Sequence, residues 1–402
     1  MKRIVLFFTV FISVLFLQPA CNQSNKTVAP EDVGLSSDTL GIAAPKMRQY
    51  IDNGKLAGIS TLIYKNGETV YRENFGYASL ENQRPLENDA IFRIFSMTKP
   101  ITAVALMTLY DDGKFQLDDK VSDYIPEFKG TQVYNPETKT TEPQVQEVTI
   151  RHLLTHTSGI PYGWDQKAFV DSLYRVTGVG GWDGTIGEKV KQLAGLPLKN
   201  QPGTKWEYGL SIDVAGYLVE VLSEKPLDEY FKTKIFDPLK MEDTGFYVPE
   251  EKHNRFSDVF SVAGGELRGA QGRMSEAFKS PVTLFSGGGG LVSTIDDYTR
   301  FCRMLLNGGE LDGNRILKES TVKMIMANQL PEGVTYNENE GYGLAGTVNL
   351  ATGEYGWAGA ASTKFWINPQ EQMIVLAFAQ LMPSDYAFAD DFKKIVDRAV
   401  ME

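Results

Sequence analysis

Cysteine and histidine are scarce in this chain of 402 residues, and each scarcity excludes a class of chemistry. Two cysteines, Cys21 and Cys302, cannot build a disulfide framework, so we expect stability to come from a hydrophobic core. Of the three histidines, His152 and His156 lie four residues apart, but no glutamate follows His152 as a His-Glu-x-x-His zinc site requires. We therefore expect no metal and no cofactor, and interpret both histidines as structural.

Several motifs and charge clusters are also absent. The net charge is −11 and the basic residues form no cluster, which argues against nucleic acid or an anionic membrane surface as a partner. No Gly-x-Ser-x-Gly elbow occurs, although a Ser-His-Asp triad around His156 stays open as an alternative. The run Gly287–Gly290 lacks the Lys-Ser/Thr of a phosphate loop. We interpret this run as a close backbone approach before a helix capped by Ser293 or Thr294.

The longest apolar run lies at the N-terminus. It covers residues 4–17, follows Lys2 and Arg3, and is too short to span a bilayer comfortably. After Gln18, Pro19 and Ala20 comes Cys21, where a bacterial lipoprotein signal places its lipidated cysteine. We predict a signal peptide over 1–20, lipidation of Cys21 and a polar tether over 21–30, with an unmodified cysteine as the alternative. The protein would be exported and lipid-anchored to the bacterial cell envelope, facing the periplasm or exterior, and would contact membrane only through the anchor.

Strand patterns concentrate at the two ends of the remaining chain. Asn66-Gly67 and Asn368-Pro369 are turn signals that predict two hairpins, of strands 58–64 with 68–77 and 362–367 with 373–380. A helical periodicity precedes the first hairpin, over 37–53, and another follows the second, over 386–400. Consecutive hairpins favour an antiparallel sheet, so we predict one sheet built from both chain termini with helices packed on it.

The middle of the chain has a different pattern and reads mainly as helices and long polar loops. We predict a single domain over 31–402, with a sheet region at about 31–116 and 281–402 and a mostly helical insert at about 117–280. A long insert makes a cleft between the two parts, and clefts of this kind hold functional sites.

A possible catalytic pair opens an apolar-periodic helix. Ser96-Met97-Thr98-Lys99 precedes Ile101 and Val104, and the spacing of three puts Ser96 and Lys99 on one helix face. The partial positive charge of a helix N-terminus favours an alkoxide on Ser96. This geometry predicts a serine nucleophile activated by a lysine.

The pattern is weak when it stands alone, because a second copy occurs at Ser320 and Lys323. We interpret Ser320 as the cap of a helix and Lys323 as a solvated side chain. Other motifs must therefore choose between the two copies.

Two further sequence motifs favour Ser96 and Lys99 over the second copy. They are Pro202–Ser211, which contains Tyr208, and Gly356–Ala360, which contains Trp357-x-Gly359. With support from residues 149–159 and 287–294, the chain resembles the serine β-lactamase and penicillin-binding protein superfamily, specifically the class C β-lactamase-like group with its esterases and D-peptidases. The resemblance implies an α/β sandwich of the β-lactamase/transpeptidase-like type.

The resemblance also implies a role for each matching residue. Ser96 would be the acylated nucleophile, Lys99 its proton acceptor or the group that tunes it, and Tyr208 the group that passes the proton to the leaving group. The backbone N–H groups of Ser96 and Ala360 would form the oxyanion hole. Trp357 and Gly359 would contact the substrate. Whether Lys99 or Tyr208 acts as the general base stays open.

This chain departs from the family at two positions. Leu210 stands two residues after Tyr208, where penicillin-recognising members have Asn, and Trp357 replaces the Lys or His that opens their third box. We therefore expect an esterase acting through an acyl-enzyme on Ser96, with a small-molecule ester or amide as its partner. The alternatives are a D,D-peptidase, D-aminopeptidase or β-lactamase, and a non-catalytic envelope binding protein. The oligomeric state stays open, and candidates for the pocket wall are the aromatic loop residues Tyr162, Trp164 and Tyr342.

Overall fold

A computed structural model of the chain describes residues 28–401. The predicted signal peptide, Cys21 and most of the tether lie outside these residues, so lipidation and the division of the chain into segments stay predictions. The first element of the described residues is a short 3₁₀ turn, η1 (Pro30–Val33). No helix between residues 28 and 401 is both long and apolar enough to cross a membrane.

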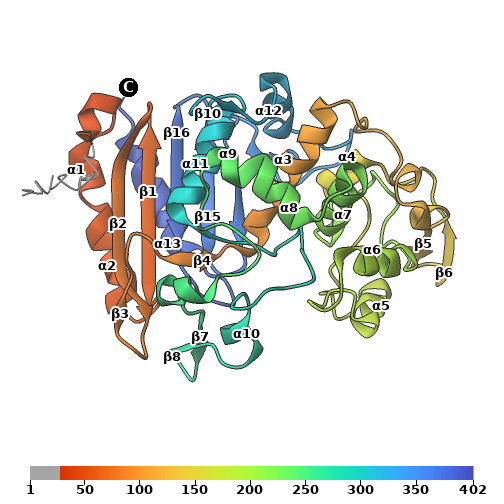
Figure 1. Cartoon of the computed structure of the whole chain (residues 1–402), viewed down its shortest axis with the longest axis horizontal. Coiled ribbons are helices and arrows are strands. Elements are labelled where there is room, and N and C mark those ends of the chain that lie inside the picture. Colours follow the sequence, from red (N-terminus) through yellow and green to blue (C-terminus); the bar gives the residue numbers. More distant parts are fainter. Residues whose placement is uncertain (1–27, 402) are drawn as a thin grey trace, which may run out of the picture.

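The centre of the molecule is an eight-stranded antiparallel sheet (Figure 1). Its strand order is β12-β13-β14-β15-β16-β1-β2-β3, so the strands near the N-terminus continue a sheet started by those near the C-terminus. This arrangement confirms the predicted sheet built from both ends. The strands are β1 (Gly58–Lys65), β2 (Glu68–Ser79), β3 (Arg84–Pro85), β12 (Glu340–Tyr342), β13 (Thr347–Asn349), β14 (Tyr355–Gly359), β15 (Thr363–Asn368) and β16 (Met373–Phe378).

Two hairpins and one long-range pairing build the middle of this sheet. The β1–β2 turn has positive φ at Asn66 and Gly67, as the turn signal predicts. The β15–β16 turn follows Asn368, whose side chain accepts the backbone N–H groups of Gln370 and Glu371. Strand β1 then pairs with β16, from Ser60 opposite Phe378 to Lys65 opposite Met373, which joins the two hairpins.

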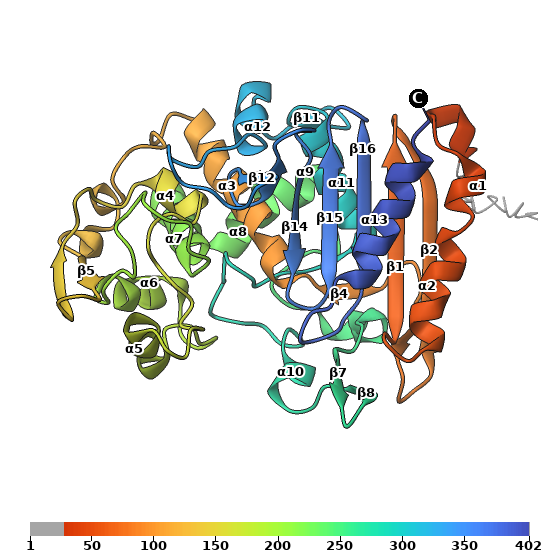
Figure 2. The ribbon, with the colours of Figure 1, turned by 180° about the vertical axis from the view of Figure 1, so that it is seen from behind.

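Both faces of the sheet are covered, and β16 shows how. Its side chains alternate between two hydrophobic cores, because successive residues of a strand point to opposite faces. Helices α1 (Ser37–Leu40), α2 (Ala43–Asp52) and α13 (Ala387–Ala399) cover one face (Figure 2). Helix α11 (Ile295–Leu306) covers the other, together with α3 (Thr98–Asp111) (Figure 1). Met373, Val375 and Ala377 belong to the core beneath α1, α2 and α13. Ile374, Leu376 and Phe378 belong to the core beneath α3 and α11.

Two predicted elements need correction. The helix predicted over 37–53 breaks into α1 and α2 around Gly41, because Pro45 has no N–H and fits the first turn of a new helix. The middle region, predicted to be mostly helical, also contains two small hairpins, β5–β6 and β7–β8, and a further pair β10–β11 follows it. Their strands are β5 (Gln132–Asn135), β6 (Thr140–Pro143), β7 (Phe260–Ala263), β8 (Glu266–Gly269), β10 (Glu310–Leu311) and β11 (Asn314–Arg315).

Helices dominate the rest of the middle region, and those between residues 150 and 223 lie beyond one edge of the sheet (Figures 1 and 2). Short 3₁₀ and π turns connect some of them. The helices are α4 (Ile150–Leu154), α5 (Phe169–Thr177), α6 (Ile186–Ala194), α7 (Ser211–Ser223), α8 (Leu227–Phe231), α9 (Asp237–Leu239) and α10 (Arg273–Glu276), and α12 (Glu319–Ile325) follows later in the chain.

Candidate active site

Ser96 lies in a short 3₁₀ turn, η2 (Phe95–Met97), between strand β4 (Ile91–Arg93) and helix α3. Strand β4 pairs with β9 (Val292–Thr294), which brings the glycine run before β9 alongside the serine. The buried hydroxyl of Tyr298 in α11 donates to the carbonyl of Met97 at 2.9 Å. The nucleophile candidate is thus fixed between a strand pair and a buried helix.

Lys99, in the first turn of α3, is completely buried and faces Ser96. Its Nζ donates to Ser96 Oγ at 3.0 Å, to Tyr162 Oη at 3.0 Å and to the carbonyl of Gly288. Three oxygen atoms, from a serine, a tyrosine and the backbone, therefore surround the amine. The predicted spacing therefore does bring the amine to the hydroxyl.

Tyr208 approaches Ser96 from the insert. Its Oη donates to Ser96 Oγ at 2.7 Å, and Lys99 Nζ lies 4.8 Å from the centre of its ring. Helix α7 begins three residues later and packs against α3, which carries Tyr208 to the serine. Gly209 permits this approach, because a Cβ there would lie 1.9 Å from the carbonyl oxygen of Ile160.

A buried carboxylate holds the glycine run 287–290 in place. Asp213, in the first turn of α7, accepts the Ser286 hydroxyl at 2.6 Å and the N–H of Gly288 at 3.4 Å. Lys189 Nζ lies 3.9 Å from the same carboxylate, and both side chains are buried. A buried charge needs such partners. Asp213 thus sets the position of the carbonyl that Lys99 contacts.

Nothing in the sequence pattern singled out Asp213, and Tyr162 was predicted only as a candidate for the pocket wall. Burial first, and then the neighbouring Tyr208 and Asp213, hold the pKa of Tyr162 well above its ordinary value, so its hydroxyl stays neutral beside Lys99. The available signal for Asp213 was a charged residue inside the apolar helix pattern of α7.

The third box lies across from Tyr208. Trp357, in β14, is half-buried, and its ring centre lies 5.6 Å from that of Tyr208 and 5.3 Å from that of Tyr342. Trp164 lies close as well, with its ring stacked on Tyr162 at 4.3 Å. The structure thus places Tyr162 and Trp164 beside Tyr208. Tyr342 is not in a loop as predicted: it ends strand β12 and packs against Trp357.

Gly359 and Ala360 lie at the end of β14, against the turn that carries Ser96. A Cβ at Gly359 would lie 2.2 Å from the carbonyl oxygen of Ile94, so only glycine permits this contact. Among residues 28–401, neither the N–H of Ser96 nor that of Ala360 has a hydrogen-bond acceptor. Both groups are available to a ligand, as an oxyanion hole requires.

The two neighbouring histidines have structural surroundings. His152 forms a capping box at the start of α4: its Nδ1 accepts the N–H of Thr149, whose hydroxyl accepts the N–H of His152. His156 is completely buried beside the Tyr208 ring, and within the described part of the chain its ring nitrogens contact no hydrogen-bond partner. Burial and the charge of Lys99 lower its pKa well below the ordinary value. A Ser-His-Asp triad through His156 is therefore not formed.

The second Ser-x-x-Lys copy lies elsewhere, on α12. Lys323 is exposed, as predicted, and pairs with Glu319 at 2.7 Å. Ser320 is not the cap that the sequence suggested: Lys318 precedes the helix and Ser320 is its second residue. The run before β9 behaves as predicted, because the Thr294 hydroxyl accepts the N–H of Asp297 and caps α11. Across residues 28–401, no group of three or more His, Cys, Asp or Glu side chains is arranged to hold a metal ion.

Comparison with known proteins identifies the family of this chain. A family model described as Beta-lactamase matches residues 43–399. An uncharacterized protein of Mycobacterium tuberculosis (strain CDC 1551 / Oshkosh) is 31% identical over 363 residues, which cover 84% of this chain and 89% of that protein. Esterase EstB of Burkholderia gladioli is 33% identical over 268 residues, or 63% of this chain and 66% of EstB.

A solved structure supports the same assignment at the level of the fold. EstCE1, described as a hydrolase with promiscuous acyltransferase activity, has a TM-score of 0.77 and 24% sequence identity over 89% of this chain and 98% of that chain. This likeness confirms the predicted β-lactamase/transpeptidase-like fold. The match to the family model extends over nearly the whole described structure and includes all three boxes. The chain belongs to the beta-lactamase family.

Proposed function

We propose that this protein is a serine hydrolase that cleaves small carboxylic esters through an acyl-enzyme on Ser96. The observation that carries the proposal is the position of Ser96 Oγ, 3.0 Å from Lys99 Nζ and 2.7 Å from Tyr208 Oη. A serine hydroxyl becomes a nucleophile when a neighbouring group accepts its proton. The similarity to esterase EstB supports ester cleavage over other acyl transfers.

The reaction balances with these groups alone. Ser96 Oγ bonds to the carbonyl carbon as its proton passes to the free amine of Lys99 or to the phenolate of Tyr208, whichever of the two is deprotonated in the reacting enzyme. The N–H groups of Ser96 and Ala360 donate to the oxyanion. The bond between the carbonyl carbon and the alkoxy oxygen then breaks, and Tyr208 delivers the proton to the departing alcohol. Water attacks the acyl-enzyme by the same route, which releases the acid and restores the Ser96 hydroxyl.

The side chains that separate this chain from penicillin-recognising members favour an ester. Leu210 is buried and has no polar group, so it cannot hold a substrate amide. Trp357 brings an aromatic ring where those members have a cation, so an anionic substrate group finds no charge there. An ester needs neither contact. A D-peptide or β-lactam, by contrast, would leave polar groups unpaired, which costs affinity.

The test compares three substrate classes on the protein without residues 1–20. We expect turnover of short-chain p-nitrophenyl esters, and little or none of D-Ala-D-Ala peptides or a chromogenic cephalosporin. Ser96→Ala should lower kcat by about 10³-fold or more, whereas Ser320→Ala should leave it unchanged. Preferred turnover of the peptide or the cephalosporin would transfer the assignment to the peptidase or β-lactamase class. Full ester turnover by Ser96→Ala would refute the proposed nucleophile.

A further inference from the structure

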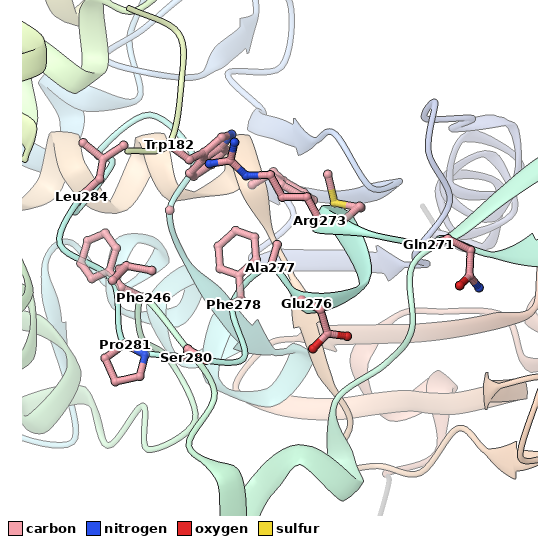
Figure 3. Close-up of a pocket in the computed structure, with 14 residues that line it drawn as sticks. Trp182, Phe246, Gln271, Arg273, Glu276, Ala277, Phe278, Ser280, Pro281 and Leu284 are labelled. Atoms are coloured by element: carbon pink, nitrogen blue, oxygen red, sulfur yellow. The ribbon is translucent and has the colours of Figure 1, made fainter. Parts of the chain in front are cut away.

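A second cavity lies beside η2 and is lined by Phe95, the residue before Ser96. Its volume is about 560 Å³, and it opens between η2, α10 and the segment that follows α10 (Figure 3). It shares no lining residue with the small cavity that Tyr162, Trp164 and Tyr208 line. We call it the apolar pocket, and its principal walls are Phe95, Trp182, Phe246, Ala277, Phe278 and Leu284.

The apolar pocket begins at the residue before the nucleophile. Phe95 packs edge-on against Phe278 with ring centres 5.6 Å apart, and Trp182 meets Phe278 at 5.9 Å. Ala360, whose N–H faces the same turn as Ser96, packs on the cluster that contains these two phenylalanines. An acyl group attached to Ser96 therefore has an apolar surface beside it.

The far wall of the apolar pocket is fixed by a buried cation. Arg93 in β4 is 1% exposed and donates to the carbonyls of Ser275 and Ala277 at 3.2 and 3.0 Å. Its guanidinium also lies 3.9 Å from the centre of the Phe256 ring. The strand that leads to Ser96 thus holds the segment that lines the pocket, and the distance between the two is set by the fold.

The charged groups lie at the mouth. Arg273 pairs with Asp183 at 3.2 Å, and both side chains are largely exposed. Figure 3 shows Phe246, Phe278 and Ala277 gathered around one hollow, with Trp182 beside Arg273. A pocket with apolar walls and charges only at its edge binds an uncharged hydrocarbon chain.

We propose that the apolar pocket binds the acyl chain of the ester substrate and sets a preference for unbranched chains longer than acetyl. The inference rests on the proposed ester hydrolysis. Tyr208 protonates the leaving alcohol, so the alcohol lies on the Tyr208 side of Ser96. The acyl chain then extends away from Tyr208, toward Phe95 and the apolar pocket.

The first test is a series of p-nitrophenyl esters from acetate to hexanoate. Burial of each methylene should raise kcat/KM by about fourfold. Ala277→Phe narrows the apolar pocket while the backbone carbonyl that Arg93 contacts stays in place. We expect it to lower the hexanoate-to-acetate ratio of kcat/KM by about tenfold or more. Ala277→Ser, a matched small substitution, should keep the wild-type ratio.

Phosphonylation separates this inference from the proposed function. Ser96 Oγ attacks phosphorus of an alkyl fluorophosphonate and fluoride leaves. The rate of phosphonylation therefore shows how well the alkyl chain binds, without any ester being turned over. We expect an octyl reagent to react faster than an ethyl reagent, and Ala277→Phe to remove the difference. Two results would overturn the proposed role of the apolar pocket alone. One is ester hydrolysis whose kcat/KM does not depend on acyl chain length. The other is an Ala277→Phe variant that keeps both the wild-type hexanoate-to-acetate ratio and the wild-type preference for the octyl reagent. An octyl preference without ester hydrolysis would support the pocket and refute the ester substrate.

Discussion

Ser96 Oγ accepts hydrogen bonds from a lysine and a tyrosine that reach it from different parts of the chain. Lys99 belongs to the same helical turn, whereas Tyr208 follows 112 residues later. The sequence predicts the first contact because a spacing of three fixes it on a helix. It predicts the second only through resemblance, since no local rule joins residues so distant. Asp213 went unpredicted for the same reason, whereas the glycine run 287–290 was predicted as a close backbone approach.

At Tyr208, removal of the hydroxyl alone tests its part in proton transfer. Tyr208→Phe keeps the ring that packs against His156 and Trp357. We expect kcat for a p-nitrophenyl ester to fall by about 10²- to 10⁴-fold, as when a general acid or base is lost, with the melting temperature nearly unchanged. Tyr336→Phe, which alters a tyrosine that contacts Trp206 instead, serves as the control. Equal kcat in wild type and Tyr208→Phe would exclude the proposed proton path.

At His152, burial makes stability depend on pH. Desolvation is the main cause that lowers its pKa to about 4, from 6.5 in the unfolded chain. The unfolded state therefore binds more protons between these values, so the folded state loses stability as pH falls from about 6.5 to 4, by at most about 3 kcal/mol from this group.

The variant His152→Gln isolates this effect, because glutamine at the same helix position can still close the capping box with Thr149. Urea unfolding at several pH values should show a smaller loss of the free energy of unfolding between pH 6.5 and 4 than in wild type. An unchanged pH dependence would assign the loss to other groups.

Among the secondary-structure elements, those with local signals were predicted well. The β1–β2 and β15–β16 hairpins follow their turn residues, and the cap of α11 follows Thr294. Elements without such signals were missed: the strands of β5–β6 are short and polar, as in Thr140–Pro143. The β4–β9 pairing joins segments about 200 residues apart, and only the folded chain brings them together.

The contact between β14 and η2 can be tested at Gly359. In Gly359→Ala the new methyl group would lie 2.2 Å from the Ile94 carbonyl oxygen, so β14 must move away from the turn that carries Ser96. We expect the free energy of unfolding to fall by about 1–3 kcal/mol, and ester turnover to fall as the Ala360 N–H is displaced. Gly269→Ala, where a Cβ meets no atom within 4 Å, should change neither. Full activity in Gly359→Ala would contradict the predicted role of the Ala360 N–H.

At the scale of the whole molecule, the fold places one sheet and a mostly helical region on either side of Ser96. The sheet side supplies η2 and β14. The insert supplies Tyr208 and Tyr162, and also most of the walls of the apolar pocket. Periodicity and turn signals predict a sheet built from both ends of the chain, as the strand order shows. The positions of the two parts around the serine depend on the packing of α3 against α7, for which sequence patterns give no register.

Attachment to the envelope is a prediction about the whole chain. Metabolic labelling with palmitate of a bacterium expressing residues 1–402 should tag the wild-type protein and not Cys21→Ala. Cys302→Ala is the matched control and should keep the tag, because Cys302 is completely buried in the core. A tag that survives Cys21→Ala, or is missing from the wild type, would refute lipidation of Cys21.

The identity of the nucleophile is the central claim, and covalent labelling tests it most directly. The protein without residues 1–20 would be treated with a fluorophosphonate, digested, and analysed by mass spectrometry for the modified residue. We predict one adduct, on Ser96, with Ser320 unmodified and Ser96→Ala unlabelled. An adduct on Ser320 or any other residue, or an esterase that remains active without any adduct, would contradict the account.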